Sequence, residues 1–358
     1  MTGAVLLMLL AYLAALPLAW RLSPVAGASL MAAVALATVT VLSPLAGLWL
    51  GATTLATPLV MRAGDRLGRR GLVTALWGGV LVALLLGLRD LPGILWIGGA
   101  YFTLRHLHVL MDWWLGLLAT PTLGDYARYQ FFLPVMAAGP IHRFPPFRAA
   151  IAARRWQPEQ IFTGAERALF GAFMAVVLGG WAMHRLGALV DRDIRLWGDF
   201  AYEWAMAVLY WIELYFTFAG LASVAVGLAL MAGLRIEENF NQPWRARNLV
   251  EFWTHWHITL SNWCRDYVFR PVAALTRRPA LGVVLSMLAM GLWHGSNAYW
   301  LLWGLWQGLG IVLTRAAFRL PLARVPLALR AVVGPVVVFG WLTLSRPVIV
   351  VLLGVPLP

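Results

Sequence analysis

The chain has 358 residues, of which 61% are hydrophobic and only 12% are charged, and its formal net charge is +13. A soluble globular protein carries about twice that charged fraction, so a water-soluble fold is excluded for want of polar surface. Apolar runs of about 20 residues, the length that crosses a bilayer as a helix, recur along the chain. Backbone polar groups in lipid must be paired within their own segment, so these runs predict helices.

In chain order, we predict an all-α polytopic membrane protein with about ten transmembrane helices. The whole chain, 1–358, is predicted to form one integral-membrane domain, because no long linker or internal repeat divides it. The first run lacks a basic N-terminal stretch and leads directly into further runs, so we expect a retained helix and not a cleaved signal peptide. The predicted spans are residues 2–20, 24–42, 44–61, 71–89, 93–118, 161–181, 200–232, 280–297, 298–314 and 331–354.

The basic residues indicate the orientation of these spans. All 28 are arginine, and the absence of lysine excludes Schiff-base and P-loop lysine chemistry. Arginine-rich connections remain in the cytoplasm, which predicts a cytoplasmic location for residues 62–70, 143–167, 235–278 and 315–330. The connection at 184–199 is close to neutral and is predicted to be external. Topology accounts for the positive charge, so no nucleic-acid partner is predicted, although each patch would attract an anionic ligand.

Two stretches between the spans have unusual compositions. Residues 125–150 contain four prolines and Gly139 among aromatic residues, which predicts a re-entrant or interfacial loop surrounded by protein. Residues 248–275 carry too many charges for a span but keep a helical apolar stripe, which predicts an amphipathic helix at the cytoplasmic surface or pushed into the bundle. The stripe consists of Trp253, Trp256, His257, Leu260 and Trp263. A polar face is predicted for His255, Thr259, Asn262 and Asp266.

The strongest catalytic candidate is His294, near the end of a span. An ionisable group at that depth suggests a function, and a neutral imidazole can remain there and still accept a proton, as a general base does. Gly291 and Gly295 flank it at GxxxG spacing, which predicts close approach of another backbone. The alternative is a histidine that is hydrogen-bonded only for packing.

His257 is the second candidate, since it falls in the tryptophan stripe whereas His255 falls on the polar side. The alternative is an interfacial histidine without a role. The two histidines do not form a metal site, because positions i and i+2 lie about 200° apart on a helix. The single cysteine, Cys264, permits neither an internal disulfide nor a cysteine-based metal site, so no metal is predicted.

Several further residues are predicted to contact substrate. Asn239 and Asn241 precede Pro243 and could donate to an oxyanion, hold a histidine or simply form a turn. Arg265 could bind a phosphate or pair with Asp266. The tryptophans beside the two histidines, Trp253, Trp256 and Trp293, complete this set.

Asp112 is a further substrate-binding candidate, in the predicted span 93–118. Arg105 lies seven residues before it, two helical turns away on the same side. The two side chains could therefore line one polar cavity, or they could form a structural ion pair.

Four segments make the chain recognisable: residues 103–116 with Asp112, "FFLPVMAAGPIHRF" at 131–144, the long run at 214–272 with "NFNQPWRARNLVEFWTHWHITLSNWCRDYVF", and "GLWHG" at 291–295. Over residues 103–310 the sequence resembles the membrane-bound O-acyltransferase superfamily. Within it, the resemblance is to the bacterial branch of alginate O-acetylation proteins and D-alanyl lipoteichoic acid transfer proteins.

The resemblance implies a helical bundle around a tunnel in the bacterial inner membrane. The family's invariant histidine matches His294, and its second, cytoplasmic-side histidine matches His257. An acyl thioester, acetyl-CoA or a charged acyl carrier protein, would be the co-substrate, with no bound cofactor. The branch usually has aspartates in the run "YFTFAGLAS", at positions held here by Thr217 and Ser223, so the acceptor can differ.

We therefore expect an O-acyltransferase that moves an acyl group, acetyl by preference, to a hydroxyl of a carbohydrate or cell-envelope polymer. Transfer would be direct or through an extracytoplasmic esterase-like partner protein. The alternatives are D-alanyl transfer from an acidic carrier protein and acylation of a lipid or small molecule. A transporter or non-catalytic scaffold in contact with membrane lipid is the alternative from another class.

Overall fold

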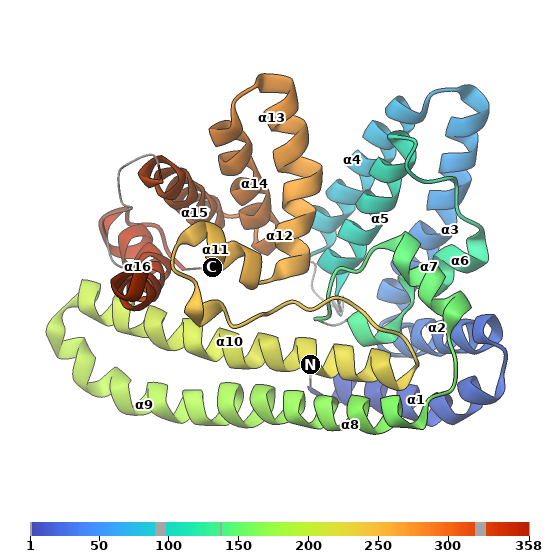
Figure 1. Ribbon diagram of the computed structural model, residues 1–358, viewed down its shortest axis with the longest axis horizontal. Helices are drawn as coiled ribbons and strands as arrows, with labels where there is room; N and C mark the ends of the chain where they lie inside the picture. The colour runs from blue at the N-terminus through green and yellow to red at the C-terminus, as the bar shows by residue number, and fades with distance from the viewer. Residues whose placement is uncertain (1, 90–97, 137, 319–326, 358) are drawn as a thin grey trace. The chain divides into compact units, whose positions relative to one another are not determined.

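The computed structural model describes residues 2–89, 98–136, 138–318 and 327–357. These residues are almost entirely helical and contain no β-strand, only one isolated bridge between Phe240 and Trp256 (Figure 1). The all-α prediction is confirmed for this part of the chain.

The chain divides into two compact units, which we call unit 1 and unit 2. Unit 1 comprises Met1–Leu169 and Ala222–Glu237, and unit 2 comprises Phe170–Leu221 and Glu238–Pro358. Each unit is described by itself below. The single membrane domain over 1–358 stays a prediction.

Unit 1 begins with four long helices whose ends follow from local sequence. Ser23 and Ser43 accept hydrogen bonds from the backbone N–H three residues later, and a proline follows each serine as the first helical residue. Gly68 ends the third helix in the left-handed region, at φ 64°. The elements are α1 Thr2–Arg21, α2 Pro24–Leu42, α3 Pro44–Leu67, α4 Arg70–Leu88, α5 Gly99–Trp114, α6 Leu123–Gln130, a 3-10 turn Leu133–Val135, α7 Phe144–Ala153 and α8 Pro158–Phe173, whose last residues belong to unit 2.

Unit 2 contains the elements that follow, apart from the end of α10. α14 and α15 lie side by side (Figure 1). After α8 come a π-helical segment Met174–Ala182, α9 Met183–Ile194, a 3-10 turn Arg195–Trp197, α10 Asp199–Met231, a 3-10 turn Pro243–Arg245, α11 Leu249–His255, α12 Ile258–Cys264, a π-helical turn Arg265–Phe269, α13 Arg270–Thr276, α14 Pro279–His294, α15 Ala298–Ala317, α16 Leu327–Pro347 and a π-helical turn Val348–Leu352.

Among the described residues, six helices are long and apolar enough to cross a membrane: Pro24–Leu42, Pro44–Leu67, Arg70–Leu88, Pro158–Asp191, Asp199–Met231 and Ala331–Leu352. Two shorter apolar helices are Leu6–Arg21 and Pro279–His294. All eight coincide with predicted spans, so the chain is a multi-pass membrane protein. The total of about ten spans stays a prediction. Of the predicted span 93–118, residues 93–97 lie outside the described residues, and α5 begins at Gly99.

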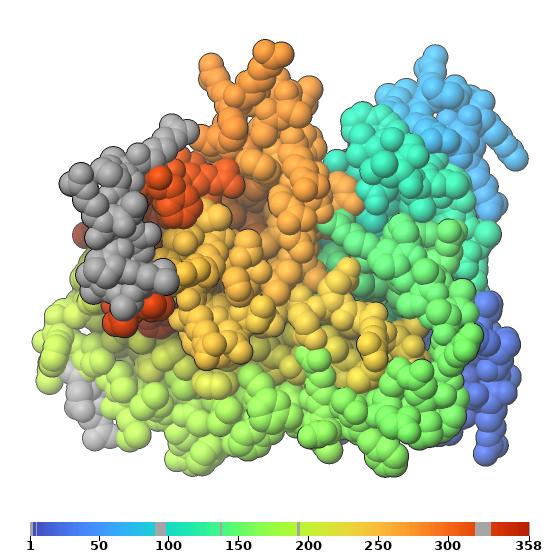
Figure 2. All heavy atoms as spheres, viewed as in Figure 1, coloured from blue at the N-terminus to red at the C-terminus, as the bar shows by residue number. Residues whose placement is uncertain are grey.

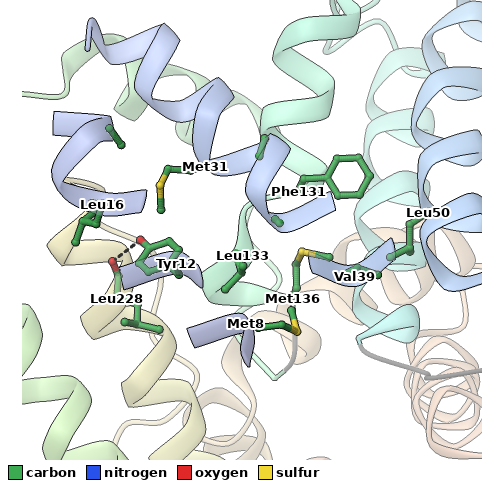
Figure 3. Packing of buried hydrophobic residues seen from close by; sticks show 14 of the residues in the cluster. Met8, Tyr12, Leu16, Met31, Val39, Leu50, Phe131, Leu133, Met136 and Leu228 are labelled. Carbon is green, nitrogen blue, oxygen red and sulfur yellow. Dashed lines mark hydrogen bonds between the residues drawn. The ribbon is translucent and has the colours of Figure 1, made fainter. Parts of the chain in front are cut away.

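The core of unit 1 joins its first helices to the end of α10 (Figure 3). Tyr12 in α1 is 1% exposed, and its hydroxyl donates a 2.8 Å hydrogen bond to the Leu228 carbonyl. A buried tyrosine hydroxyl needs such a partner. The same hydrophobic cluster contains Met8, Leu16, Met31, Val39, Leu50, Phe131, Leu133 and Met136.

The predicted helix-breaking loop at 125–150 is only partly non-helical. Its ends form α6 and α7, whereas residues 138–143 are non-helical. The carbonyl of His142 accepts the Tyr129 hydroxyl at 2.7 Å, and the Phe144 N–H donates to His108 Nε2 at 3.0 Å. Buried side chains therefore satisfy the irregular backbone, as such a segment in a membrane protein requires.

Candidate functional site

The prediction of one continuous amphipathic helix over 248–275 is wrong at its centre. α11 ends at His255, Trp256 is extended, and His257 has a left-handed φ of 43° before α12 begins at Ile258. A left-handed conformation is uncommon in residues other than glycine and has to be held by its surroundings. The apolar residues of the stripe keep helical spacing on both sides of His257, so their spacing alone does not reveal that the helix is interrupted there.

Residues 239–241, which precede α11, stabilise this break between α11 and α12. The Asn241 N–H donates to the His255 carbonyl at 3.0 Å, and the Ile258 N–H donates to the Asn239 carbonyl at 2.9 Å. These two bonds lie on either side of His257 and replace the helical bonds that would otherwise form there. We call residues 255–258 the His257 bend.

Asn239 is the central polar residue of the bend. It is fully buried, and its Oδ1 accepts the Thr259 hydroxyl at 2.6 Å and the Thr259 N–H at 3.4 Å. Of the three roles predicted for Asn239, the geometry fits that of holding a histidine. Asn241 has an exposed side chain and contributes through its backbone. Thr259, predicted on the polar face, is buried at 5% exposure and bonds to the polar side chain of Asn239.

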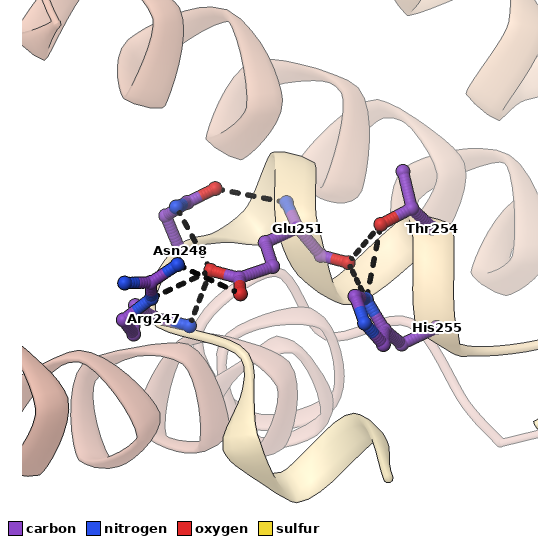
Figure 4. A network of polar contacts seen from close by, with 5 residues as sticks. All are labelled: Arg247, Asn248, Glu251, Thr254 and His255. Carbon is purple, nitrogen blue, oxygen red and sulfur yellow. Dashed lines mark hydrogen bonds and ion pairs between the residues drawn. The ribbon is translucent and has the colours of Figure 1, made fainter. Parts of the chain in front are cut away.

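His255 belongs to a polar network at the start of α11 (Figure 4). Asn248 Oδ1 accepts the Glu251 N–H at 2.8 Å, and the Glu251 carboxylate accepts the Arg247 N–H and Nε–H at 3.0 and 3.2 Å. His255 Nδ1 and the Thr254 hydroxyl lie 2.8 and 2.7 Å from the Glu251 carbonyl. These contacts give His255 a local structural role, and the preference for His257 as the functional histidine stays a prediction.

His257 is enclosed by aromatic rings and is 3% exposed. Its ring meets Phe218 edge-on at 4.7 Å and Trp293 at 5.6 Å between centroids. Burial, and then the nearby His294, hold the pKa of His257 well below its usual value. The imidazole is therefore neutral at pH 7 and carries one N–H.

His294 is the last residue of α14, and its side chain is exposed. Its ring stacks on Trp300 at 4.8 Å with 19° between the planes, and it meets Trp303 edge-on at 5.3 Å. A Cβ at Gly291 would lie 2.3 Å from the Trp300 carbonyl oxygen, and one at Gly295 would lie 2.2 Å from the Trp300 ring. The predicted close approach at this glycine pair is confirmed, and it places Trp300 against the accessible histidine.

The two histidines line the same cavity of about 170 Å³ within unit 2. Its walls come from α10, the His257 bend, α14, α15 and α16. Trp253 and Trp256 also line it, and Trp293 contacts both imidazoles. The lining residues are Ala207, Tyr210, Trp211, Leu214, Phe218, Trp253, Trp256, His257, Met290, His294, Tyr299, Trp300, Trp303, Ser345 and Arg346.

The sequence analysis did not identify the ion pair between Arg346 and Glu203 at this cavity. Arg346 in α16 lines the cavity, and its Nε lies 2.6 Å from Glu203 Oε2 in α10. Both residues stand within apolar spans. A charge inside such a span is the signal that could have revealed them.

Arg265 and Asp266 lie beyond α12 on the π-helical turn, where Arg265 is exposed and Asp266 is partly buried. Arg265 Nε and Arg270 Nη1 each lie 3.0 Å from Asp266 Oδ1. Of the two predicted roles of Arg265, the structure therefore shows the ion pair.

Asp112 belongs to unit 1, where its Oδ2 lies 3.1 Å from His108 Nδ1. Because His108 Nε2 accepts the Phe144 N–H, the proton of a neutral His108 is assigned to Nδ1 and is donated to Asp112. Arg105 Nη1 donates to the Tyr129 carbonyl at 3.2 Å. Arg105 and Asp112 therefore bond to different groups: Arg105 connects α5 to Tyr129, whereas Asp112 bonds to His108 within α5, and His108 connects α5 to Phe144.

In the part of the chain that the structure describes, no group of three or more His, Cys, Asp and Glu side chains has the arrangement of a metal site. The cavity presents two imidazoles, several indole rings and the guanidinium of Arg346.

Comparison with known proteins places these features in a family context. The profile of the membrane-bound O-acyltransferase family matches residues 110–352. A probable alginate O-acetylase AlgI of Pseudomonas aeruginosa is 33% identical over 225 residues, which cover 62% of this chain and 42% of that protein.

Two other relatives carry different activities in their names. A teichoic acid D-alanyltransferase of Streptococcus thermophilus is 29% identical over 62% of this chain and 57% of its own length. A peptidoglycan O-acetyltransferase of Helicobacter pylori is 29% identical over 54% of this chain and 37% of its own length. The chain thus spans roughly half the length of these relatives.

Proposed function

Because the chain belongs to the membrane-bound O-acyltransferase family, we propose that it moves an acyl group, acetyl by preference, from a cytoplasmic thioester to a hydroxyl. The donor is acetyl-CoA or a charged acyl carrier protein, bound as a co-substrate. The acceptor is a carbohydrate or cell-envelope polymer, reached directly or through an extracytoplasmic partner protein. The O-acetylation and D-alanyl transfer in the names of the relatives support this class of reaction.

One observation carries the proposal: an accessible histidine and a buried, neutral histidine line one cavity. His294 can be reached by a substrate, whereas His257 is fixed by the bend and shielded from water. A general base needs access to the proton that it removes, and a group that stabilises developing charge needs a fixed place in a dry site. The two environments match these two roles.

In the proposed reaction, an unprotonated ring nitrogen of His294 takes the proton of the acceptor hydroxyl as its oxygen attacks the thioester carbonyl carbon. The N–H of His257 donates to the oxyanion that forms on the carbonyl oxygen. When the intermediate collapses, the carbon–sulfur bond breaks and His294 returns the proton to the thiolate. The products are an ester and a free thiol, and no other reactant is required.

The membrane arrangement is part of the same proposal. We place the protein in the bacterial inner membrane, with α1, α5, α14 and α15 crossing the bilayer besides the six longer spans. The resulting bundle of about ten spans would surround the tunnel that the family resemblance implies.

The test is acyl transfer by the purified protein with labelled acetyl-CoA in detergent. His294→Ala should lower the rate by about 10²- to 10⁴-fold, the contribution of a general base. His255→Ala is the matched control, since it removes a histidine that contacts Glu251 and Thr254 outside the cavity, and it should keep the wild-type rate. Wild-type acyl transfer by a folded His294→Ala protein would show that His294 is not the base.

D-Alanyl transfer from an acidic carrier protein is a second candidate, and one surface favours it. Arg277 and Arg278, in the turn between α13 and α14, are exposed, and neither forms an ion pair with a described residue. This turn projects with its side chains uncovered (Figure 2). An acidic carrier would be attracted to such a surface. Transfer from a D-alanyl carrier protein but not from acetyl-CoA would select this candidate.

A further inference from the structure

The cavity of the two histidines has one charged group in its wall, the guanidinium of Arg346. Arg346 is in the last turn of α16 and Glu203 in the second turn of α10, both inside helices long and apolar enough to cross a membrane. A charged pair in such segments is expensive to keep, and arginine within a span by default suggests a functional site. A purely structural tie between α10 and α16 could be made by apolar side chains at lower cost.

The ion pair uses only part of the guanidinium. Arg346 Nε donates to Glu203 Oε2 at 2.6 Å, and no other described residue forms a hydrogen bond or ion pair with Arg346. Its side chain is 19% exposed, and neither terminal nitrogen is fully buried. Both Nη groups, with four N–H bonds, are thus open to a ligand in the cavity.

The chemistry of this opening is specific. A guanidinium presents its N–H bonds in a planar fork that matches two oxygens of a carboxylate or phosphate. Glu203 fixes the Nε edge, so the fork has a defined direction before any ligand arrives. The neighbouring wall contains Tyr210, Tyr299 and Ser345, whose hydroxyls suit a hydroxylated ligand.

We propose that Arg346 binds an anionic oxygen group of the acyl acceptor, a carboxylate or a phosphate close to the hydroxyl that His294 deprotonates. Glu203 is a positioning residue that orients the guanidinium. The inference rests on the proposed function, because it assigns the acceptor end of the same cavity. It predicts that the enzyme selects acidic polymers over neutral ones.

The experiment uses the purified full chain, labelled acetyl-CoA and three acceptor probes. These are a short uronic acid oligomer, the same oligomer with its carboxylates reduced to neutral hydroxymethyl groups, and a short glycerol phosphate oligomer. The wild type should show a lower KM for at least one anionic probe than for the neutral one. The probe with the lower KM identifies the anion as carboxylate or phosphate.

Arg346→Gln should raise the KM for the preferred anionic probe by about 10- to 100-fold, the range of a lost charge-assisted hydrogen bond. Its kcat, and its KM for the neutral probe, should stay within about twofold of wild type. Arg346→Lys keeps the charge but not the fork, and should raise the same KM less. If Arg346→Gln does not fold, the lysine variant carries the test alone.

Two results would overturn the inference, and they are distinguishable. If the wild type acylates the probes and an Arg346 variant loses the anionic and neutral probes equally, Arg346 is only structural and the proposed function stands. If the wild type transfers no acetyl group from acetyl-CoA to any probe, the proposed function fails for these acceptors and the inference fails with it. Glu203→Gln should preserve the preference for the anionic probe, because its amide oxygen can still accept the Nε–H.

Discussion

At the scale of residues, the two histidines of the cavity differ in their surroundings although both follow a tryptophan in the sequence. His257 is buried among Phe218, Trp293 and the bend, and its lowered pKa keeps it neutral. His294 is exposed and stacked on Trp300, which leaves its ring accessible. Access and enclosure, rather than residue type, decide which imidazole can exchange a proton with a substrate.

The lowered pKa of His257 predicts a pH dependence of stability. The unfolded chain binds a proton at this histidine near its usual pKa of about 6.5 and the folded chain does not, so stability falls as the pH drops below that value. Between about pH 7.5 and about pH 5.5, His257 should account for about 1 kcal/mol of lost stability.

The measurement is thermal unfolding in detergent across this pH range. His257→Gln removes the titrating group, so its melting temperature should fall less on acidification than that of the wild type. Parallel curves for the two proteins would show that folding does not lower the pKa of His257.

At the scale of elements, the His257 bend is the feature on which the site depends. It separates α11 from α12, and the contacts that stabilise it come from Asn239 and Asn241, which precede α11 in the chain. The Asn239–Thr259 hydrogen bond joins the two sides. His257, at the centre of the bend, lines the cavity.

Asn239→Ala should therefore lower acyl transfer through kcat, about 10- to 100-fold, because a displaced His257 loses its hold on the oxyanion. The KM of the acceptor should change less, since Asn239 does not line the cavity. Asn241→Ala is the matched control, as its exposed side chain leaves the backbone bond intact. Steady-state kinetics of both variants decide the point, and equal behaviour of the two would contradict the role of Asn239.

The close packing of α14 on α15 gives a second prediction at this scale. Gly291→Ala places a methyl group 2.3 Å from the Trp300 carbonyl oxygen, so the helices must separate and the variant should lose about 1–3 kcal/mol of stability. The stacking of Trp300 on His294 should loosen as well, with a loss of activity.

Gly79→Ala is the control for this substitution, because its Cβ would meet no heavy atom within 4 Å. Alanine there should be neutral or stabilise the helix by a few tenths of a kcal/mol. Comparison of the two melting temperatures is the measurement. An unchanged Gly291→Ala protein would mean that the helices are packed less closely than described.

At the scale of the whole molecule, the arginine pattern predicts which connections face the cytoplasm. The Gly68 turn and the α13–α14 turn should be cytoplasmic, and the turn Arg195–Trp197 should be external. The only native cysteine, Cys264, is buried, and burial raises the pKa of its thiol to about 12. A membrane-impermeant maleimide should therefore leave it unlabelled.

Single cysteines at exposed leucines can read this orientation. Leu196→Cys should react with the maleimide in intact cells, whereas Leu67→Cys and Leu275→Cys should react only after the membrane is opened. The three leucines are 87%, 68% and 86% exposed, so exposure does not limit the labelling. Labelling of Leu275→Cys in intact cells would show that the α13–α14 turn is external and that the proposed orientation is wrong.

The sequence by itself determined the class of protein and the places of the long helices, and it selected His257 and His294 as catalytic candidates. Span positions follow from runs of apolar residues and from local caps such as Ser43 and Gly68, which are properties of neighbouring residues. For the same reason the helix ends at 24, 42 and 44 agree with the prediction.

Only the tertiary structure showed that His257 and His294 line one cavity and that Arg346 lines it with them. The bend depends on a bond between positions 20 residues apart, and the Arg346–Glu203 pair joins positions 143 residues apart. Hydrophobic periodicity carries no information about such contacts, because it reports the face of one helix and not the partner that packs against it. The continuous helix predicted over 248–275 failed at the residue whose conformation those distant contacts impose.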